Sequence, residues 1–172
     1  MKTNIHKISS LRAKIQNRAG FTLIELLVVI GIIGILAAIV LVAVNPGRQF
    51  AQARDAQRRA DLLGITNSVY QFAAEHNGNL PDTNPDPNVN SFPSTPTRIG
   101  TGAGNFNLGA AGEIEAAVGS QEIVVPTYIA AIPKDPSTGT DANTMYTIYR
   151  DTNGRLVATA SGELSGVISV TR

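Results

Sequence analysis

The sequence predicts an α+β protein in which one long N-terminal helix packs on a small three-stranded antiparallel sheet. Residues 26–44 form an apolar run without a charged side chain, which is long enough to span a membrane. An apolar stripe with helical spacing follows, and three short apolar-rich segments separated by glycine-containing turns end the chain. The long helix is therefore expected to have a membrane-spanning first half and an amphipathic second half.

Length, composition and charge limit the functional classes. The 172 residues leave room for one modest domain beside a targeting segment, and the absence of cysteine excludes a disulfide-dense secreted scaffold. Residues 1–20 are strongly basic and contain no acid, whereas residues 21–172 contain all 13 acidic side chains. A basic head before an apolar run is typical of a segment kept on the cytoplasmic side. The acidic remainder predicts no direct nucleic-acid binding.

The apolar segment is predicted to be an uncleaved single-span anchor. As a helix, residues 21–44 would extend about 36 Å, which is enough for a hydrocarbon core of about 30 Å. The apolar region of a secretory signal peptide is normally about 7–15 residues, followed by a small-residue cleavage site. Here the run is longer, and the small pair Ala37-Ala38 lies inside it. This order favours an anchor over a conventional signal peptide.

Glu25 is the one acid at the start of this apolar segment. A carboxylate at the centre of a bilayer costs roughly 2.5–3.5 kcal/mol, but Glu25 lies only about 6 Å along the helix axis from Phe21 and near a helix N-terminus that favours an anion. The position of Glu25 thus explains why a carboxylate is tolerated in this segment, but it does not explain what the carboxylate does. A cut between Gly20 and Phe21 would create a cationic amine one helical turn before Glu25. The amine of a second copy would then neutralise the carboxylate, most strongly where water is excluded.

The stretch "RAGFTLIELLVVIGIIGILAAIV" closely resembles the processing site and N-terminal helix of type IV pilins and of the related pseudopilins of type II secretion. The resemblance implies that a prepilin peptidase cuts after Gly20 and methylates the new N-terminus, Phe21. It also implies that Glu25 is an assembly residue that pairs with the terminal amine of a neighbouring subunit. Ala19 departs from the family pattern, in which Lys or Arg is frequent beside the glycine; Arg18 lies one residue further away.

Helix packing has separate support in the small residues of the same segment. Gly31, Gly34 and Ala38 are spaced by three and four residues, so they share one helix face. Small residues so placed let helix backbones approach closely. Glycine is also common in membrane helices in general, so this pattern adds only modest support.

The membrane half is expected to end at "VNPGRQ" (44–49), where Pro46 removes a helical hydrogen bond and Gly47 loosens the backbone. A helix break is therefore predicted at Pro46 and Gly47, with an amphipathic helix continuing over residues 45–76. Its apolar stripe is predicted to pack on a small sheet rather than to form a coiled coil, and its charged residues are expected to form the polar surface. The stripe is Leu62, Ile65, Val69 and Phe72, and the charged residues are Arg54, Asp55, Arg58, Arg59 and Asp61.

The rest of the chain divides by composition. Residues 77–120 are expected to form a long polar loop because Pro, Gly, Asn, Ser and Thr dominate residues 77–112; a short helix is possible within 112–119. Residues 121–172 are expected to form a turn region and the antiparallel sheet. The predicted strands are 144–150, 155–161 and 166–172, with Asn153-Gly154 as a hairpin turn.

Neither a metal site nor a catalytic site is predicted. The alternating oxygen donors of "DTNPDPNVN" (82–90) have EF-hand-like spacing, but proline occupies the positions of the essential glycine and glutamate. Major pseudopilins bind calcium near their C-terminal sheet, and here Asp135, Asp141 and Glu163 supply few of the expected ligands. His6 lies in the expected leader and His76 at a helix end, which leaves Ser and Thr without a paired base. The chain is therefore not expected to be an enzyme or to hold a cofactor.

The resemblance implies a structural filament subunit. Residues 1–20 would be a leader removed by prepilin peptidase, and residues 21–44 would hold the protein in the cytoplasmic membrane as a single pass with the N-terminus inside. An inner-membrane assembly platform would then move it from membrane lipid into a homopolymeric filament at the cell surface. Two alternatives stay open: a pseudopilin of a type II secretion or DNA-uptake apparatus, and a monomeric membrane-anchored surface binding protein.

Overall fold

The computed structural model describes residues 20–84, 91–113 and 122–172. The chain divides into two compact units, with the boundary between Val44 and Asn45. The expected leader lies almost entirely outside the described residues.

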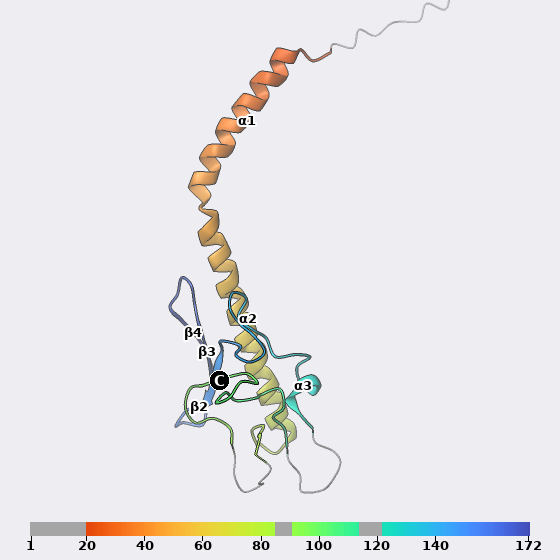
Figure 1. The fold of residues 1–172 in the computed structure, drawn as a ribbon, viewed down its shortest axis with the longest axis vertical. Helices are drawn as coiled ribbons and strands as arrows, with labels where there is room; N and C mark the ends of the chain where they lie inside the picture. Colours follow the sequence, from red (N-terminus) through yellow and green to blue (C-terminus); the bar gives the residue numbers. More distant parts are fainter. Residues whose placement is uncertain (1–19, 85–90, 114–121) are drawn as a thin grey trace, which may run out of the picture. The chain divides into compact units, whose positions relative to one another are not determined.

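The first unit consists of one helix, α1 (Leu23–Val44), coloured orange in Figure 1. It begins directly after Thr22, and none of its residues is buried within the chain. Helical geometry satisfies every interior backbone N–H and C=O within the segment, which hydrocarbon surroundings require. Within the described part of the chain, α1 is the one helix that is long and apolar enough to cross a membrane. The predicted long apolar helix is thus confirmed, and it begins at Leu23, two residues after the expected start at residue 21.

The second unit begins with α2 (Pro46–Glu75), which is capped at both ends. The Asn45 side chain accepts a hydrogen bond from the Arg48 N–H, and Pro46 takes the first helical position, where its missing N–H costs nothing. At the other end, the Gly78 N–H donates to the Ala73 carbonyl, and Gly78 has a φ of 88° that favours glycine.

The sheet has four antiparallel strands in the order β1-β2-β3-β4. Its strands are β1 (Thr97–Arg98), β2 (Thr147–Arg150), β3 (Leu156–Ser161) and β4 (Val167–Thr171). The three predicted strands correspond to β2, β3 and β4. Strand β1 was not predicted, because it is only two residues long and lies in a segment rich in Pro and Thr. A one-turn helix, α3 (Val124–Thr127), precedes the sheet strands of the C-terminal half.

The core lies between α2 and the sheet. The α2 side chains Leu62, Ile65, Val69 and Phe72 are fully buried, and α2 contacts both β3 and β4. The sheet contributes Ile148, Leu156, Ala158 and Ile168 to the same cluster. The prediction that the apolar stripe packs on an antiparallel sheet is confirmed. Burial of each large apolar side chain contributes about 1.5–3 kcal/mol to folding.

The segment after α2 differs from the expected surface loop. Five of its apolar side chains are buried in the core: Phe92, Ile99, Phe106, Leu108 and Ala111. Backbone bridges hold this segment in place, among them Ile99 to Phe106 and Gly112 to both Asp82 and Ile123. The expectation was wrong here because apolar residues spaced without helical or strand periodicity give no local signal of burial. The possible helix within 112–119 falls mainly outside the described residues.

Candidate processing and assembly site

The bond expected to be cut, between Gly20 and Phe21, lies in non-helical backbone immediately before α1. Both residues are exposed, and Phe21 keeps 89% of its surface accessible. A peptide bond in exposed, non-helical backbone is available to a peptidase, because no helical hydrogen bonds must first be broken. The position of the bond is therefore compatible with cleavage.

Thr22 and Glu25 form a reciprocal cap at the start of α1. The Thr22 backbone N–H and the Thr22 hydroxyl each lie 2.8 Å from Glu25 Oε2 and donate to it, and the Glu25 N–H lies 3.3 Å from Thr22 Oγ1. This is a capping box, in which a Thr N-cap and a Glu three residues later satisfy each other's free donors. Sequence reasoning missed it, although Thr22-Leu23-Ile24-Glu25 has the T-x-x-E signature of this motif.

The capping box fixes the position of the Glu25 carboxylate at the start of α1. The hydrogen bonds to its side chain all end on Oε2, and they hold the carboxylate at the positive end of the α1 dipole. Neither donor is a cation, so among the described residues the negative charge of Glu25 is hydrogen-bonded but has no ion-pair partner. The arrangement can accept an ammonium group on the other carboxylate oxygen.

The predicted packing residues lie in the middle of α1. A Cβ atom added to Gly31 or Gly34 would meet no atom within 4 Å in the chain. No contact within the described chain therefore explains these two glycines, and the face they share with Ala38 is open to another helix.

The structure places the helix interruption at Asn45, one residue before the predicted Pro46 and Gly47. Asn45 has a left-handed backbone (φ 45°, ψ 78°), whereas Pro46 and Gly47 are the first residues of α2. The signal in the sequence was the pair Asn-Pro, because Asn suits an N-cap and Pro the next position, and the residue before proline avoids helical geometry.

The second unit contains a buried ionic network that sequence reasoning placed on the surface. Arg58 is 3% exposed, and its guanidinium lies 2.6 Å from Asp135, 2.8 Å from Asp55 and 3.1 Å from Glu163. The Arg54 guanidinium, which is partly exposed, forms two further bonds to Glu163. The network joins α2 to residues 135–138 and to the β3–β4 turn. The expectation that Asp55, Arg58 and Asp61 form the polar surface is therefore wrong, because partners distant in sequence allow their burial.

Hydrogen bonds to these carboxylates lower their pKa values. Backbone donation from Glu163 is the largest cause that lowers the pKa of Asp55 to about 2. Hydrogen bonding from Arg54 is the largest cause that lowers the pKa of Glu163 to about 2. Burial acts to raise the pKa of Asp135, but bonds from Arg58 and from two backbone N–H groups outweigh it, so this pKa is also lowered. All three groups are ionised at neutral pH.

The acids considered as calcium ligands have other partners in this structure. Asp135 and Glu163 do converge, but the Arg58 guanidinium lies between them. Asp141 pairs with Lys134 at 2.9 Å, and Asp82 accepts hydrogen bonds from Asn84 and Ser91. The remaining donors of "DTNPDPNVN" lie mainly outside the described residues. Within the described ranges, no group of three or more His, Cys, Asp or Glu side chains is placed to hold a metal ion.

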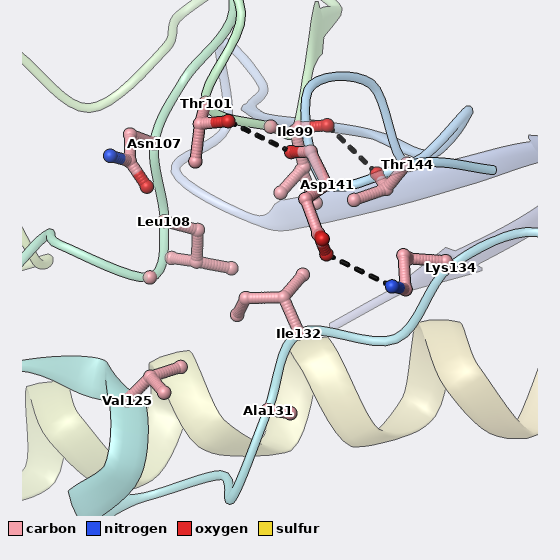
Figure 2. A pocket seen from close by; sticks show the side chains of 12 residues that line it. Ile99, Thr101, Asn107, Leu108, Val125, Ala131, Ile132, Lys134, Asp141 and Thr144 are labelled. Atoms are coloured by element: carbon pink, nitrogen blue, oxygen red, sulfur yellow. Dashed lines mark hydrogen bonds and ion pairs between the residues drawn. The ribbon is translucent and has the colours of Figure 1, made fainter.

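A cavity of about 280 Å³ lies beside the sheet in the second unit. Figure 2 shows Leu108, Val125 and Ile132 projecting into it, with the Lys134–Asp141 ion pair along one side. Thr144 also lines the cavity, but its hydroxyl donates to the Ile99 carbonyl. The lining formed by the described residues is thus mainly apolar and includes no histidine to activate a hydroxyl.

Comparison with protein-family models matches residues 15–41 to the prokaryotic N-terminal methylation motif. No curated protein and no solved structure matches the chain. The matched residues contain the bond between Gly20 and Phe21, the capping box at Glu25 and most of α1. The chain therefore carries the N-terminal methylation motif on an apolar helix that is long enough to cross a membrane, and this motif supports a prepilin of the type IV pilin-like or pseudopilin-like kind.

Proposed function

We propose that the chain is a pilin, the structural subunit of a type IV pilus. The basic leader stays in the cytoplasm while α1 holds the protein in the cytoplasmic membrane as a single pass. Prepilin peptidase removes residues 1–20 and methylates Phe21. The inner-membrane assembly platform then transfers the subunit into a helical filament, where α1 helices bundle in the core and residues 45–172 form the exposed coat.

The observation that carries the proposal is an uncovered apolar helix whose first turn holds a carboxylate that has no cationic partner among residues 20–84, 91–113 and 122–172. Every α1 residue is exposed within the chain, so lipid or other copies must cover this surface. Within the described part of the chain, the Glu25 carboxylate accepts its hydrogen bonds from Thr22. Cleavage after Gly20 converts the Phe21 nitrogen into a cationic amine, which a neighbouring copy can bring to Glu25.

The ion pair would fix the position of one subunit against the next. Two unit charges 4 Å apart attract by about 4 kcal/mol at an effective dielectric constant near 20, and removal of both groups from water offsets much of this gain. The ion pair would therefore act mainly by selecting one register between neighbouring subunits. If a subunit is displaced by one helical turn, about 5.4 Å, its amine no longer reaches its neighbour's carboxylate and both charges lose their partner. Apolar contact between helices supplies attraction, and the ion pair supplies the register.

A pseudopilin of a secretion or DNA-uptake apparatus is the second candidate, because the same motif serves both classes. The Arg58 guanidinium between Asp135 and Glu163 favours the pilus, since it occupies the space between two carboxylates that a calcium-binding pseudopilin would use for metal. The third candidate is a monomeric anchored binding protein, which needs neither cleavage nor Glu25.

Intact-mass analysis of protein from the native membrane tests the proposal. Loss of residues 1–20 together with one added methyl group is expected for a pilin or a pseudopilin. An intact N-terminus would refute both and would leave the anchored binding protein.

The variant Glu25→Ala tests the role of the carboxylate. It is expected to insert into the membrane normally and to give at least a tenfold lower yield of sheared surface filaments. The matched control is Ile30→Ala, which removes apolar atoms from α1 but no charge and is expected to keep most of the filament yield. Normal filament yield from Glu25→Ala would refute the proposed pairing.

A further inference from the structure

The turn between β3 and β4 (residues 162–166) is bound firmly to α2. Asp55 on α2 accepts hydrogen bonds from the backbone N–H groups of Glu163 and Leu164, at 2.8 and 3.0 Å. The Glu163 carboxylate in turn receives two hydrogen bonds from the Arg54 guanidinium. Both the backbone and a side chain of the turn are therefore held in a defined position within one copy of the chain.

This ordered turn presents apolar side chains to solvent. Leu164 is 50% exposed, and Val167, the first residue of β4, is 73% exposed. The Gly162 N–H donates to the Gly166 carbonyl oxygen, which closes the turn that carries Leu164. Apolar side chains on an ordered backbone bind a partner at a lower entropic cost than side chains on a loop that must first become ordered. We call Leu164 and Val167 the apolar knob.

The cavity of about 280 Å³ beside the sheet has the size and lining to receive such side chains. Leu108, Val125 and Ile132 project into it (Figure 2). An apolar cavity of about 150 Å³ is large enough to hold a benzene molecule. The cavity therefore has room for the four carbon atoms of a leucine side chain.

The knob and the cavity lie in different parts of the second unit. The turn that carries the knob is bonded to α2 at Asp55, whereas α3, which contributes Val125 to the cavity, is followed by Tyr128, whose hydroxyl donates to Glu75. Asp55 and Glu75 are about 30 Å apart along the axis of α2, at 1.5 Å per residue. In Figure 1 the turn and α3 accordingly lie on different sides of this helix.

The charges beside the knob and beside the cavity are complementary. The ionic network at the turn contains three carboxylates and two guanidinium groups, so it carries one excess negative charge. Beside the cavity, Lys134 pairs with Asp141, and Arg98 donates to the side chain of Asn143. These three ionised groups carry one excess positive charge. Opposite excess charges attract two such surfaces and help to fix their orientation.

We propose that the apolar knob of one copy docks in the cavity of the next copy along the filament. The inference rests on the proposed pilin function and adds a contact between second units to the bundling of α1. Each copy offers one knob and one cavity in different places, so the contact is heterologous and repeats from copy to copy, whereas a surface that binds itself would stop at a dimer. The ionic network then acts as the support that positions the knob.

Cysteine crosslinking tests the docking, because the natural chain has no cysteine. The double variant Val167→Cys/Ala131→Cys places one thiol at the knob and one in the cavity lining, where Ala131 is exposed. Treatment of sheared filaments with a short bismaleimide is expected to give a ladder of covalent dimers, trimers and longer oligomers in denaturing electrophoresis. The control Val167→Cys/Thr152→Cys carries its second thiol in the exposed β2–β3 turn and is expected to give no ladder.

The outcomes separate the docking from the pilin function on which it rests. Filaments that form from the first variant but give no ladder would overturn the docking and leave the pilin function intact, as would equal ladders from the variant and its control. A wild-type chain that forms no filaments would refute both.

The variant Leu164→Ser supplies a second measurement. It is expected to lower the yield of sheared filaments by about threefold or more, because the knob loses its apolar contact. Tm of the chain in detergent is expected to stay within about 3 °C of wild type, because Leu164 is already half exposed. The matched control is Leu63→Ser on α2, which removes the same atoms at a position that is 41% exposed and is expected to keep the filament yield. Equal yields from the two variants would overturn the docking.

Discussion

Replacement of Arg58 by methionine tests the energetic role of the buried network. Arg58 is 3% exposed and contacts three carboxylates from three parts of the second unit. The variant leaves these carboxylates without their central cation. Removal of one partner from a buried ionic group costs about 3–5 kcal/mol. For a unit of this size, 1 kcal/mol corresponds to roughly 3–5 °C in Tm, so Tm is expected to fall by about 10–20 °C.

The same helix offers a matched control. Arg54 also bonds to Glu163, but its side chain is 38% exposed, so Arg54→Met is expected to cost about 0.2–1 kcal/mol. Both variants lose one guanidinium and gain the same side chain, and they differ in burial. Thermal and urea unfolding of the full chain in detergent is followed by near-ultraviolet circular dichroism of the tyrosines, because the chain has no tryptophan and Tyr146 is fully buried. Equal losses for the two variants, or a loss below 1 kcal/mol for Arg58→Met, would refute the reasoning.

Three further predictions concern pH, the cap and the helix face. The pKa values of Asp55 and Glu163 are lowered to about 2, so the stability that these groups contribute is present above pH 4.5 and is lost as the pH falls towards 2. Measurement of the unfolding free energy of the wild type over this pH range checks the prediction, and an unchanged free energy would contradict it. Thr22→Ala removes the cap, at a cost of about 1 kcal/mol to the start of α1, and is expected to lower filament yield while Thr22→Ser preserves it; equal yields from the two variants would exclude a role for the hydroxyl. Replacement of Gly31 and Gly34 by leucine is expected to leave membrane insertion unchanged and to reduce filament yield, and detergent extraction with filament shearing separates the two effects.

Features set by local pattern could be predicted from the sequence. The apolar run, the stripe from Leu62 to Phe72 and the strands on either side of Asn153-Gly154 each depend on the order of neighbouring residues. Their elements accordingly occur at the predicted places. The cap between Thr22 and Glu25 was equally local, and it was missed because Glu25 was considered beside the helix dipole and a second copy, but not together with Thr22.

Features set by distant partners could not be predicted. Asp55 is the local partner of Arg58, but Asp135 and Glu163 are 77 and 105 residues away, so no window of sequence shows the partners that allow Arg58 to be buried. A charged residue on a helix is usually expected at the protein surface. In this fold, carboxylates from distant parts of the chain come together around Arg58 and allow it to be buried. The burial of Phe92 and Phe106 has the same origin, because their edge-to-face contact joins two irregular stretches of chain.

The carboxylates of the second unit are paired with cations, whereas the described residues of the first unit supply no cation to Glu25, and this difference is relevant to the proposed assembly. In the second unit the carboxylates of Asp55, Asp135 and Glu163 all contact guanidinium groups of the same chain. Among the described residues of the first unit, Glu25 has hydrogen-bond donors from Thr22 but no cationic partner. A carboxylate that is only hydrogen-bonded is stable beside water but becomes costly when helices pack around it. If helices bundle through α1 as proposed, a cation beside Glu25 would offset this cost, and the amine that cleavage would create at Phe21 is a cation that each new copy would carry at that end of its helix.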